Sequence, residues 1–317
     1  MLVEFSITNF RSIAETVTFS MEAAKERNSA IATNAAFAPH LLRIAAIFGA
    51  NGSGKTNVLL ALANVQALVR GEFALRPDPD EGLQAYFSPF IFDKDLRNAP
   101  TQFDIVFLAK ELHEEETLFN YKISYNFDRI IEEHLIARSA KPRSRDRVLF
   151  ERVWSEVDHK YEYNFGSSVE GPKDKFVPDA NETLPLLTVL GKSRTKEFVQ
   201  AYLWLVRLQI ITNVRRIFFR RPFLSPGSIT STQRMLRRDE QSAELISSFL
   251  SHLDVRVTRI DVREQTSDAH TRTEVQLVSP DRSGEEVGLP LEAESEGTRK
   301  LFELAGAWIS ALRNGDR

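Results

Sequence analysis

The sequence predicts an α/β protein built around an antiparallel sheet, and three observations carry this prediction. Apolar and polar residues alternate at the start of the chain and again between residues 100 and 165, which is the pattern of half-buried strands. Apolar residues recur every three or four positions in later segments, as in amphipathic helices. A glycine-rich segment at residues 49–56 separates a short apolar run from the first expected helix.

The first strands are expected at residues 2–10 and 16–21. Val3, Phe5 and Ile7 share one face of the first, and residues 9–12 (NFRS) form the turn between them. Residues 41–48 (LLRIAAIF) form a short apolar run, which predicts a buried central strand that ends at Gly49. The residues that follow the glycine-rich segment predict a helix.

A meander of antiparallel strands is expected in the middle of the chain. Phe103, Ile105 and Phe107 recur at every second position, as do the apolar residues over 119–127. Further strands are expected at 130–137, 147–154 and 160–165. The C-terminal half predicts helices at 196–219, 239–252 and 298–312, with strands at 255–263 and 272–278.

Composition narrows the class of protein. The chain has 317 residues, 42% hydrophobic and 27% charged, which is typical of globular proteins and not of disordered or collagen-like ones. A net charge of −3 gives no global positive field for nucleic acid. With no cysteine, disulfides, thiolate zinc sites and thiol catalysis are excluded. The longest apolar stretches are short and contain Arg43 or Arg207, and no signal peptide is recognisable, so we expect a cytoplasmic protein without membrane spans.

The glycine-rich segment matches the phosphate-loop pattern G-x-x-x-x-G-K-[ST] at every position. Its glycines allow backbone N–H groups to turn toward phosphate oxygens, and the helix N-terminus adds unsatisfied donors. Lysine supplies a charge to the β- and γ-phosphates, and the threonine hydroxyl ligates Mg²⁺. We therefore expect ATP and Mg²⁺ to bind at Gly49, Ala50, Asn51, Gly52, Ser53, Gly54, Lys55, Thr56 (the Mg²⁺ ligand) and Asn57.

Further segments carry a family resemblance across the whole chain. They are NFRSI at residues 9–13, SPFIFD at 88–93, TQFDIVF at 101–107, residues 120–138, LFERV at 149–153 and ESEGTRKLF at 294–302. Together with the phosphate loop they resemble the ABC-type ATPase heads of the RecF/SMC class. More narrowly, they are similar to the bacterial AAA family ATPases of the RloA-like and abortive-infection type.

The resemblance implies a P-loop NTPase of ABC-head type. A β-rich lobe would span residues 1–180, a helical lobe 181–253, and strands with a signature helix 254–317. It also implies that Arg11 and Ser12 lie near the nucleotide, although a plain hairpin turn with a solvated arginine is the alternative. Ser295, Glu296, Gly297 and Thr298 would contact the nucleotide of a partner subunit in a homodimer, because a serine and a glycine at a helix N-terminus suit a γ-phosphate. An ordinary helix cap is the alternative there, and both can hold at once.

Other family features are not found in the sequence. The family has an apolar strand ending in Asp-Glu (Walker B) after the last helix, and later a switch histidine; neither is recognisable in these 317 residues. We therefore expect a truncated head, with its catalytic carboxylate unassigned. Gln84 and Gln102 are both candidates for the Q-loop residue, and none of the six histidines has metal-ligand spacing.

Two basic clusters interrupt the pattern. Arg138, Lys141, Arg143, Arg145 and Arg147 predict a solvated turn. Arg215, Arg216, Arg220 and Arg221, with Arg234, Arg237 and Arg238 nearby, could meet nucleic acid or an acidic partner protein.

The function expected is that of an ATP-binding head whose nucleotide-driven dimerisation controls an effector or a nucleic-acid contact, with a role in antiphage defence implied by the resemblance. Two alternatives stay open. One is a non-hydrolysing scaffold that binds ATP and holds a partner protein, which the unrecognised Walker B strand favours. The other is a P-loop phosphotransferase, against which the NFRS and S-x-G-T segments argue.

Overall fold

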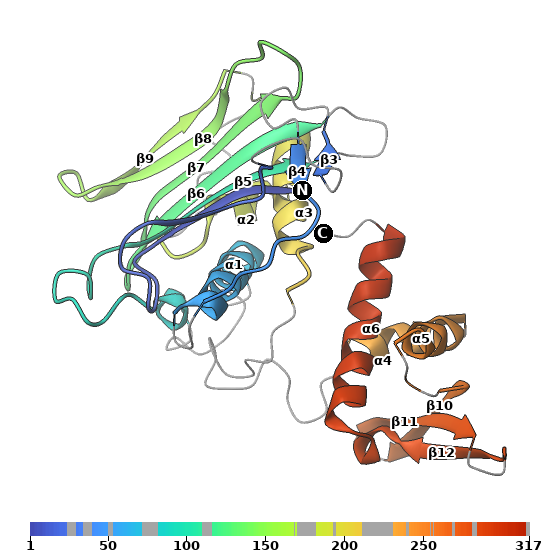
Figure 1. Ribbon diagram of the computed structural model, residues 1–317. Helices are drawn as coiled ribbons and strands as arrows, with labels where there is room; N and C mark the ends of the chain where they lie inside the picture. Colours follow the sequence, from blue (N-terminus) through green and yellow to red (C-terminus); the bar gives the residue numbers. More distant parts are fainter. Residues whose placement is uncertain are drawn as a thin grey trace. The chain divides into compact units, whose positions relative to one another are not determined.

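The computed structural model describes residues 1–23, 30–33, 40–49, 53–71, 82–109, 116–167, 169, 182–192, 195–210, 231–238, 241–253, 255, 257–267, 270–280 and 284–314 (Figure 1). The chain divides into two compact units, Met1–Ile210 and Ile211–Arg317. The residues expected to form a helical lobe at 181–253 therefore fall into both units. Among the described helices, none combines the length and apolar character needed to cross a membrane.

The first unit contains a seven-stranded antiparallel sheet in the order β2-β1-β5-β6-β7-β8-β9. Its strands are β1 (Leu2–Thr8), β2 (Val17–Ser20), β5 (Thr101–Ala109), β6 (Thr117–Tyr125), β7 (Ile130–Ser139), β8 (Arg147–Ser155) and β9 (Lys160–Phe165). The period-two pattern is confirmed: Phe103, Ile105 and Phe107 are fully buried on one face of β5. The strands expected at 130–137, 147–154 and 160–165 are confirmed as β7, β8 and β9.

Three helices pack on that apolar face of the sheet: α1 (Lys55–Arg70), α2 (Leu186–Leu190) and α3 (Lys196–Val206) (Figure 1). Trp204 of α3 stacks on Phe107 of β5 with ring centroids 4.0 Å apart. The helix expected at 196–219 ends at Val206, and residues 207–210 leave the helical conformation; the rest of that prediction lies outside the described residues. Side chains of α1 bind the C-terminal end of α3, since Gln66 and Arg70 donate hydrogen bonds to the carbonyl of Val206.

The buried central strand expected at residues 41–48 is wrong. Only His40–Leu42 form a strand (β4), which pairs with β3 (Ala30–Ala32) in a separate two-stranded sheet. Residues 44–49 are extended coil, and Ile44 and Phe48 are 84% and 90% exposed. An apolar run becomes a buried strand only where other strands bond its backbone, and no described strand pairs with residues 43–49.

The second unit packs three helices against a three-stranded antiparallel sheet. Its elements are α4 (Ser231–Arg238), α5 (Gln241–Ser251), β10 (Arg259–Ser267), β11 (His270–Pro280), β12 (Glu286–Pro290), the 3₁₀ turn η5 (Leu291–Ala293) and α6 (Glu296–Asn314). Ile246, Leu277 and Phe302 form the centre of its core. The helices expected at 239–252 and 298–312 are found as α5 and α6, and the strand expected at 272–278 as β11. The strand expected at 255–263 is found four residues later, as β10, and α4 and β12 were not expected.

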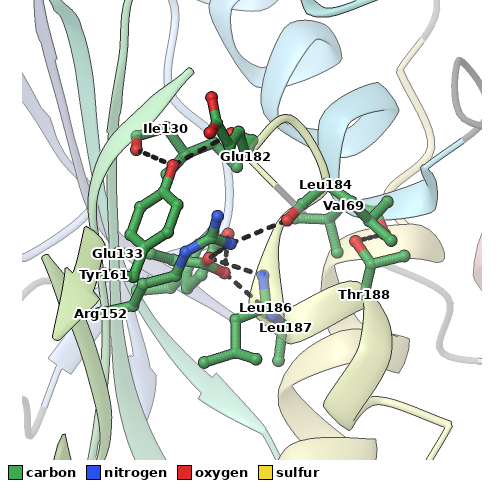
Figure 2. Close-up of polar contacts among 11 residues, drawn as sticks. Val69, Ile130, Glu133, Arg152, Tyr161, Glu182, Leu184, Leu186, Leu187 and Thr188 are labelled. Atoms are coloured by element: carbon green, nitrogen blue, oxygen red, sulfur yellow. Dashed lines mark hydrogen bonds and ion pairs between the residues drawn. The ribbon is translucent and has the colours of Figure 1, made fainter. Parts of the chain in front are cut away.

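A buried charged cluster holds α2 on the sheet of the first unit, and Figure 2 shows it in detail. The carboxylate of Glu133 on β7 accepts hydrogen bonds from the backbone amides of Leu186 at 2.6 Å and Leu187 at 2.9 Å. The Tyr121 hydroxyl donates to the same carboxylate at 2.9 Å. Because the first amides of a helix have no intrahelical acceptor, this single side chain satisfies both donors that begin α2.

Arg152 on β8 completes the cluster and is itself fully buried. Its Nη1 lies 3.8 Å from the Glu133 carboxylate and donates to the Leu184 carbonyl at 2.9 Å. Its guanidinium stacks 4.0 Å above the ring of Tyr161. Burial raises the pKa of the Glu133 carboxyl, while Arg152, the two amides and the Tyr121 hydroxyl oppose that rise.

Replacing Glu133 with Gln should lower the free energy of unfolding of the first unit by about 3–5 kcal/mol, since it leaves Arg152 as an uncompensated buried charge. Urea denaturation followed by fluorescence would measure the loss. The matched control is Glu151→Gln on the neighbouring strand β8, where the half-buried carboxylate accepts from Asn164. That control should cost less than about 1 kcal/mol. Equal losses of stability in the two variants would contradict the role of Glu133 as the partner of the buried Arg152.

Candidate functional site

The phosphate loop ends at the first residue of α1. Gly54 is the N-cap and has a left-handed backbone, with φ of 89°. A side chain there would be strained by this φ and would lie 3.0 Å from the Ser12 hydroxyl, so glycine is required. At Gly49 a Cβ would lie 2.8 Å from the Ser53 hydroxyl. Of the residues expected in the loop, Ala50, Asn51 and Gly52 lie outside the described residues.

The described loop residues fit a phosphate group. Lys55 spans the loop, and its Nζ donates to the Gly49 carbonyl at 2.8 Å. The first turn of α1 carries no acidic residue, so the positive end of the helix dipole is not neutralised there. Thr56 is exposed in the same turn, and its hydroxyl is the hard oxygen donor that Mg²⁺ prefers. Bound Mg²⁺ would neutralise charge on the β- and γ-phosphates.

The turn after β1 adopts a rare backbone conformation. Asn9 and Arg11 have φ of 51° and 55°, although neither is glycine. Phe10 and Ile13 are buried and close the turn by two mutual backbone hydrogen bonds of 2.8 and 2.9 Å. Burial lowers the pKa of the half-buried Arg11 guanidinium. Left-handed residues other than glycine concentrate at functional sites, where the surroundings must hold them in place.

This turn lies directly against the phosphate loop. Asn57, in the first turn of α1, donates from Nδ2 to the Ser12 hydroxyl at 2.7 Å. The same hydroxyl lies next to the bare Cα of Gly54. The fold thus brings Ser12, Gly54 and Asn57 together from segments more than forty positions apart in the sequence. The turn at residues 9–12 therefore contacts the phosphate loop through Ser12.

The expected signature segment begins α6 in the second unit. The Ser295 hydroxyl accepts from the Thr298 backbone amide at 3.1 Å and lies 2.9 Å from the Thr298 hydroxyl. Ser295 is therefore an ordinary N-cap in this structure, as one reading of the sequence expected. Gly297, in contrast, is not required by the fold, because a Cβ there would meet only the Ser295 hydroxyl, at 3.8 Å.

The remaining candidates are placed as follows. Gln84 is exposed in the 3₁₀ turn η3 (Leu83–Tyr86), and Gln102 lies on β5 opposite Thr8. In the part of the chain that the structure describes, no group of three or more His, Cys, Asp or Glu side chains could hold a metal ion. No acidic catalytic residue is identified by the geometry of the described residues.

The first basic cluster is the connection between β7 and β8. Arg138 lies 3.8 Å from Asp146, Arg147 lies 3.5 Å from Glu197, and Lys141, Arg143 and Arg145 are exposed, so a solvated turn is confirmed. In the second cluster, Arg215, Arg216, Arg220 and Arg221 lie outside the described residues. Arg234 and Arg237 are exposed on α4, which Arg238 ends.

Comparison with known proteins identifies the family. The family described as "AAA domain, putative AbiEii toxin, Type IV TA system" matches residues 44–315, which include the phosphate loop and the segment that begins α6. No curated protein matches the chain. The family match agrees with a P-loop nucleotide-binding fold of mixed α/β class with a large antiparallel sheet. Because the match covers most of the chain, the chain belongs to this AAA-domain family.

Proposed function

We propose that this chain is the ATP-binding head of an ABC/SMC-like ATPase whose nucleotide-driven dimerisation controls an effector or a nucleic-acid contact. The observation that carries the proposal is the contact of the turn at residues 9–12 with the phosphate loop, through Ser12, Gly54 and Asn57. A phosphate loop alone is common to many nucleotide-binding proteins. The turn that contacts it adds a hydroxyl at Gly54, from Ser12, and carries an arginine at the preceding position.

In the proposed site, Lys55 and the amides of the loop hold the β- and γ-phosphates of ATP. Thr56 holds Mg²⁺ through its hydroxyl. Arg11 adds a second positive charge, and its partial burial makes its interactions less screened than those of a surface arginine. Ser12, fixed by Asn57, offers a hydroxyl that can donate to a phosphate oxygen.

Dimerisation through the nucleotide is the second element of the proposal. Gly297 supports it because, among the described residues, a Cβ there would meet only the Ser295 hydroxyl, at an ordinary contact distance of 3.8 Å. A helix N-terminus with a serine hydroxyl and a bare glycine suits the γ-phosphate of ATP held by a second copy of the chain. The family description, with its toxin of a toxin–antitoxin system, supports effector control in phage defence.

Lys55→Ala should weaken Mg-ATP binding by about 10- to 100-fold, the loss expected for one charge-assisted hydrogen-bonding group. Titration calorimetry would measure it. Lys122→Ala is the control, because that lysine pairs with Glu132 on the sheet, 2.8 Å away, and should leave the affinity unchanged. Equal ATP affinity in wild type and Lys55→Ala would remove the basis of the nucleotide site.

Gly297→Ala should abolish ATP-dependent dimers while leaving the fold and the ATP affinity of the monomer unchanged. An alanine here should be tolerated by the monomer, because its Cβ would lie at an ordinary contact distance of 3.8 Å from the Ser295 hydroxyl. Sedimentation velocity with and without Mg-ATP reports the dimer. Glu303→Ala, at an exposed position of the same helix, is the control that should still dimerise. A variant that dimerises like wild type would contradict the role given to this segment.

Turnover separates a hydrolysing head from an ATP-binding scaffold. Hydrolysis requires a group that acts on the attacking water, and the sequence has no apolar strand ending in an acidic pair. Phosphate release by the 317-residue chain should therefore fall well below the ~1–10³ s⁻¹ that is usual for enzymes. Brisk phosphate release that disappears in Lys55→Ala would show that a carboxylate within residues 1–317 performs this step.

A further inference from the structure

Asn9 is the most constrained polar residue near the candidate site. It is 2% exposed and has a left-handed backbone, which among side-chain-bearing residues asparagine adopts most readily. Its backbone amide donates to the Ala14 carbonyl at 3.1 Å, which closes the turn that carries Arg11 and Ser12. The residue therefore stands at the base of that turn.

The side chain of Asn9 is saturated by hydrogen bonds to one distant segment. Its Nδ2 donates to the carbonyls of Leu96 at 2.9 Å and Ala99 at 2.8 Å, and more weakly to Pro100 at 3.3 Å. Its Oδ1 accepts from the Phe90 amide at 2.9 Å. A carboxylate in this place would face carbonyl oxygens instead of donating to them, so aspartate cannot substitute chemically.

The same segment holds the turn at two further points. The hydroxyl of Thr101, the first residue of β5, donates to the Asn9 carbonyl at 2.7 Å and is completely buried. The Arg11 amide donates to the Ser88 carbonyl at 2.7 Å. One end of the turn is thus fixed by residues 88–101, and its other end presents Ser12 to Gly54 and Asn57.

We propose that Asn9 is a positioning residue of the nucleotide site, which sets the turn so that Ser12 meets the phosphate loop in binding geometry. This inference rests on the proposed function, because it assigns Asn9 a role at that same site. Asn9 itself does not touch the loop; it acts through the conformation of residues 10–12. Loss of its side chain frees the strained φ of Arg11 to relax and moves the Ser12 hydroxyl away from Gly54.

The test is a double-mutant cycle on Mg-ATP affinity, measured by calorimetry on the full chain. Asn9→Gly keeps the left-handed backbone and removes the amide; it should weaken binding about tenfold, as should Ser12→Ala. Because Asn9 acts through the turn that carries Ser12, the double variant should bind clearly more tightly than the product of the two single losses implies. A role in stability alone would leave the two losses independent.

Two further variants keep the test decisive. Asn126→Gly is the control: its Oδ1 accepts from the amides of Asp128 and Arg129, both at 2.9 Å, in the turn between β6 and β7, so its loss weakens an asparagine-built turn elsewhere. It should leave ATP affinity unchanged. Thr101→Val removes one hydrogen bond to Asn9 and is the milder variant if Asn9→Gly fails to fold; it should weaken ATP binding about two- to threefold, again non-additively with Ser12→Ala.

The outcomes separate this inference from the proposed function. If wild type does not bind Mg-ATP, or binds it as well as Lys55→Ala does, the proposed function fails. If wild type binds, Lys55→Ala loses affinity, and Asn9→Gly binds like wild type or adds independently to Ser12→Ala, then only the positioning role of Asn9 is overturned.

Discussion

The packing of the helices on the sheet of the first unit depends on the hydrogen bonds between the Glu133 carboxylate and the first amides of α2. Glu133 lies on β7, an interior strand of the sheet, is fully buried and accepts hydrogen bonds from the first two amides of α2 (Figure 2). From α2, the Thr188 hydroxyl donates to the Val69 carbonyl at 2.8 Å, near the end of α1. Gly71 lacks the Cβ that would otherwise stand 2.9 Å from Leu184 and Thr188. The helix that follows the phosphate loop is therefore held at its far end by a charge buried in the sheet.

The near end of α1 is held differently, by the turn after β1, through the hydrogen bond from Asn57 to the Ser12 hydroxyl. In the proposed mechanism this end binds the nucleotide, whereas the segment that begins α6 serves the nucleotide of a partner copy. The two halves of such a composite site belong to different units of the chain. In the proposed dimer, a second copy would supply the complementary half of each site.

Much of this fold follows from the alternation of apolar residues. Strands β5 to β9, α1 and α6 were predictable because each carries its own period over six or more residues. The prediction of a buried central strand at residues 41–48 was wrong because apolar composition indicates burial but does not show which strands would hydrogen-bond the backbone of that segment. Helix α2 was missed because its five residues depend on Glu133, more than fifty positions earlier. Asn9 stood within a recognised motif, but its hydrogen bonds to residues 90–101 have no local signal.

The pairing of β1 also sets the order in which the chain can fold. Leu2 stands opposite Phe107, so β1 cannot enter the main sheet until β5 has been synthesised. The phosphate loop and the whole of α1 lie inside the loop that this pairing closes. Closing a long loop carries an entropic cost before any contact rewards it. During synthesis, Asn57 follows Ser12 after 45 residues, whereas Thr101 and the carbonyls that bind Asn9 follow only with β5 and the segment before it. The contacts that hold the turn at residues 9–12 can thus form only in two steps, and the second step requires that β5 has been synthesised.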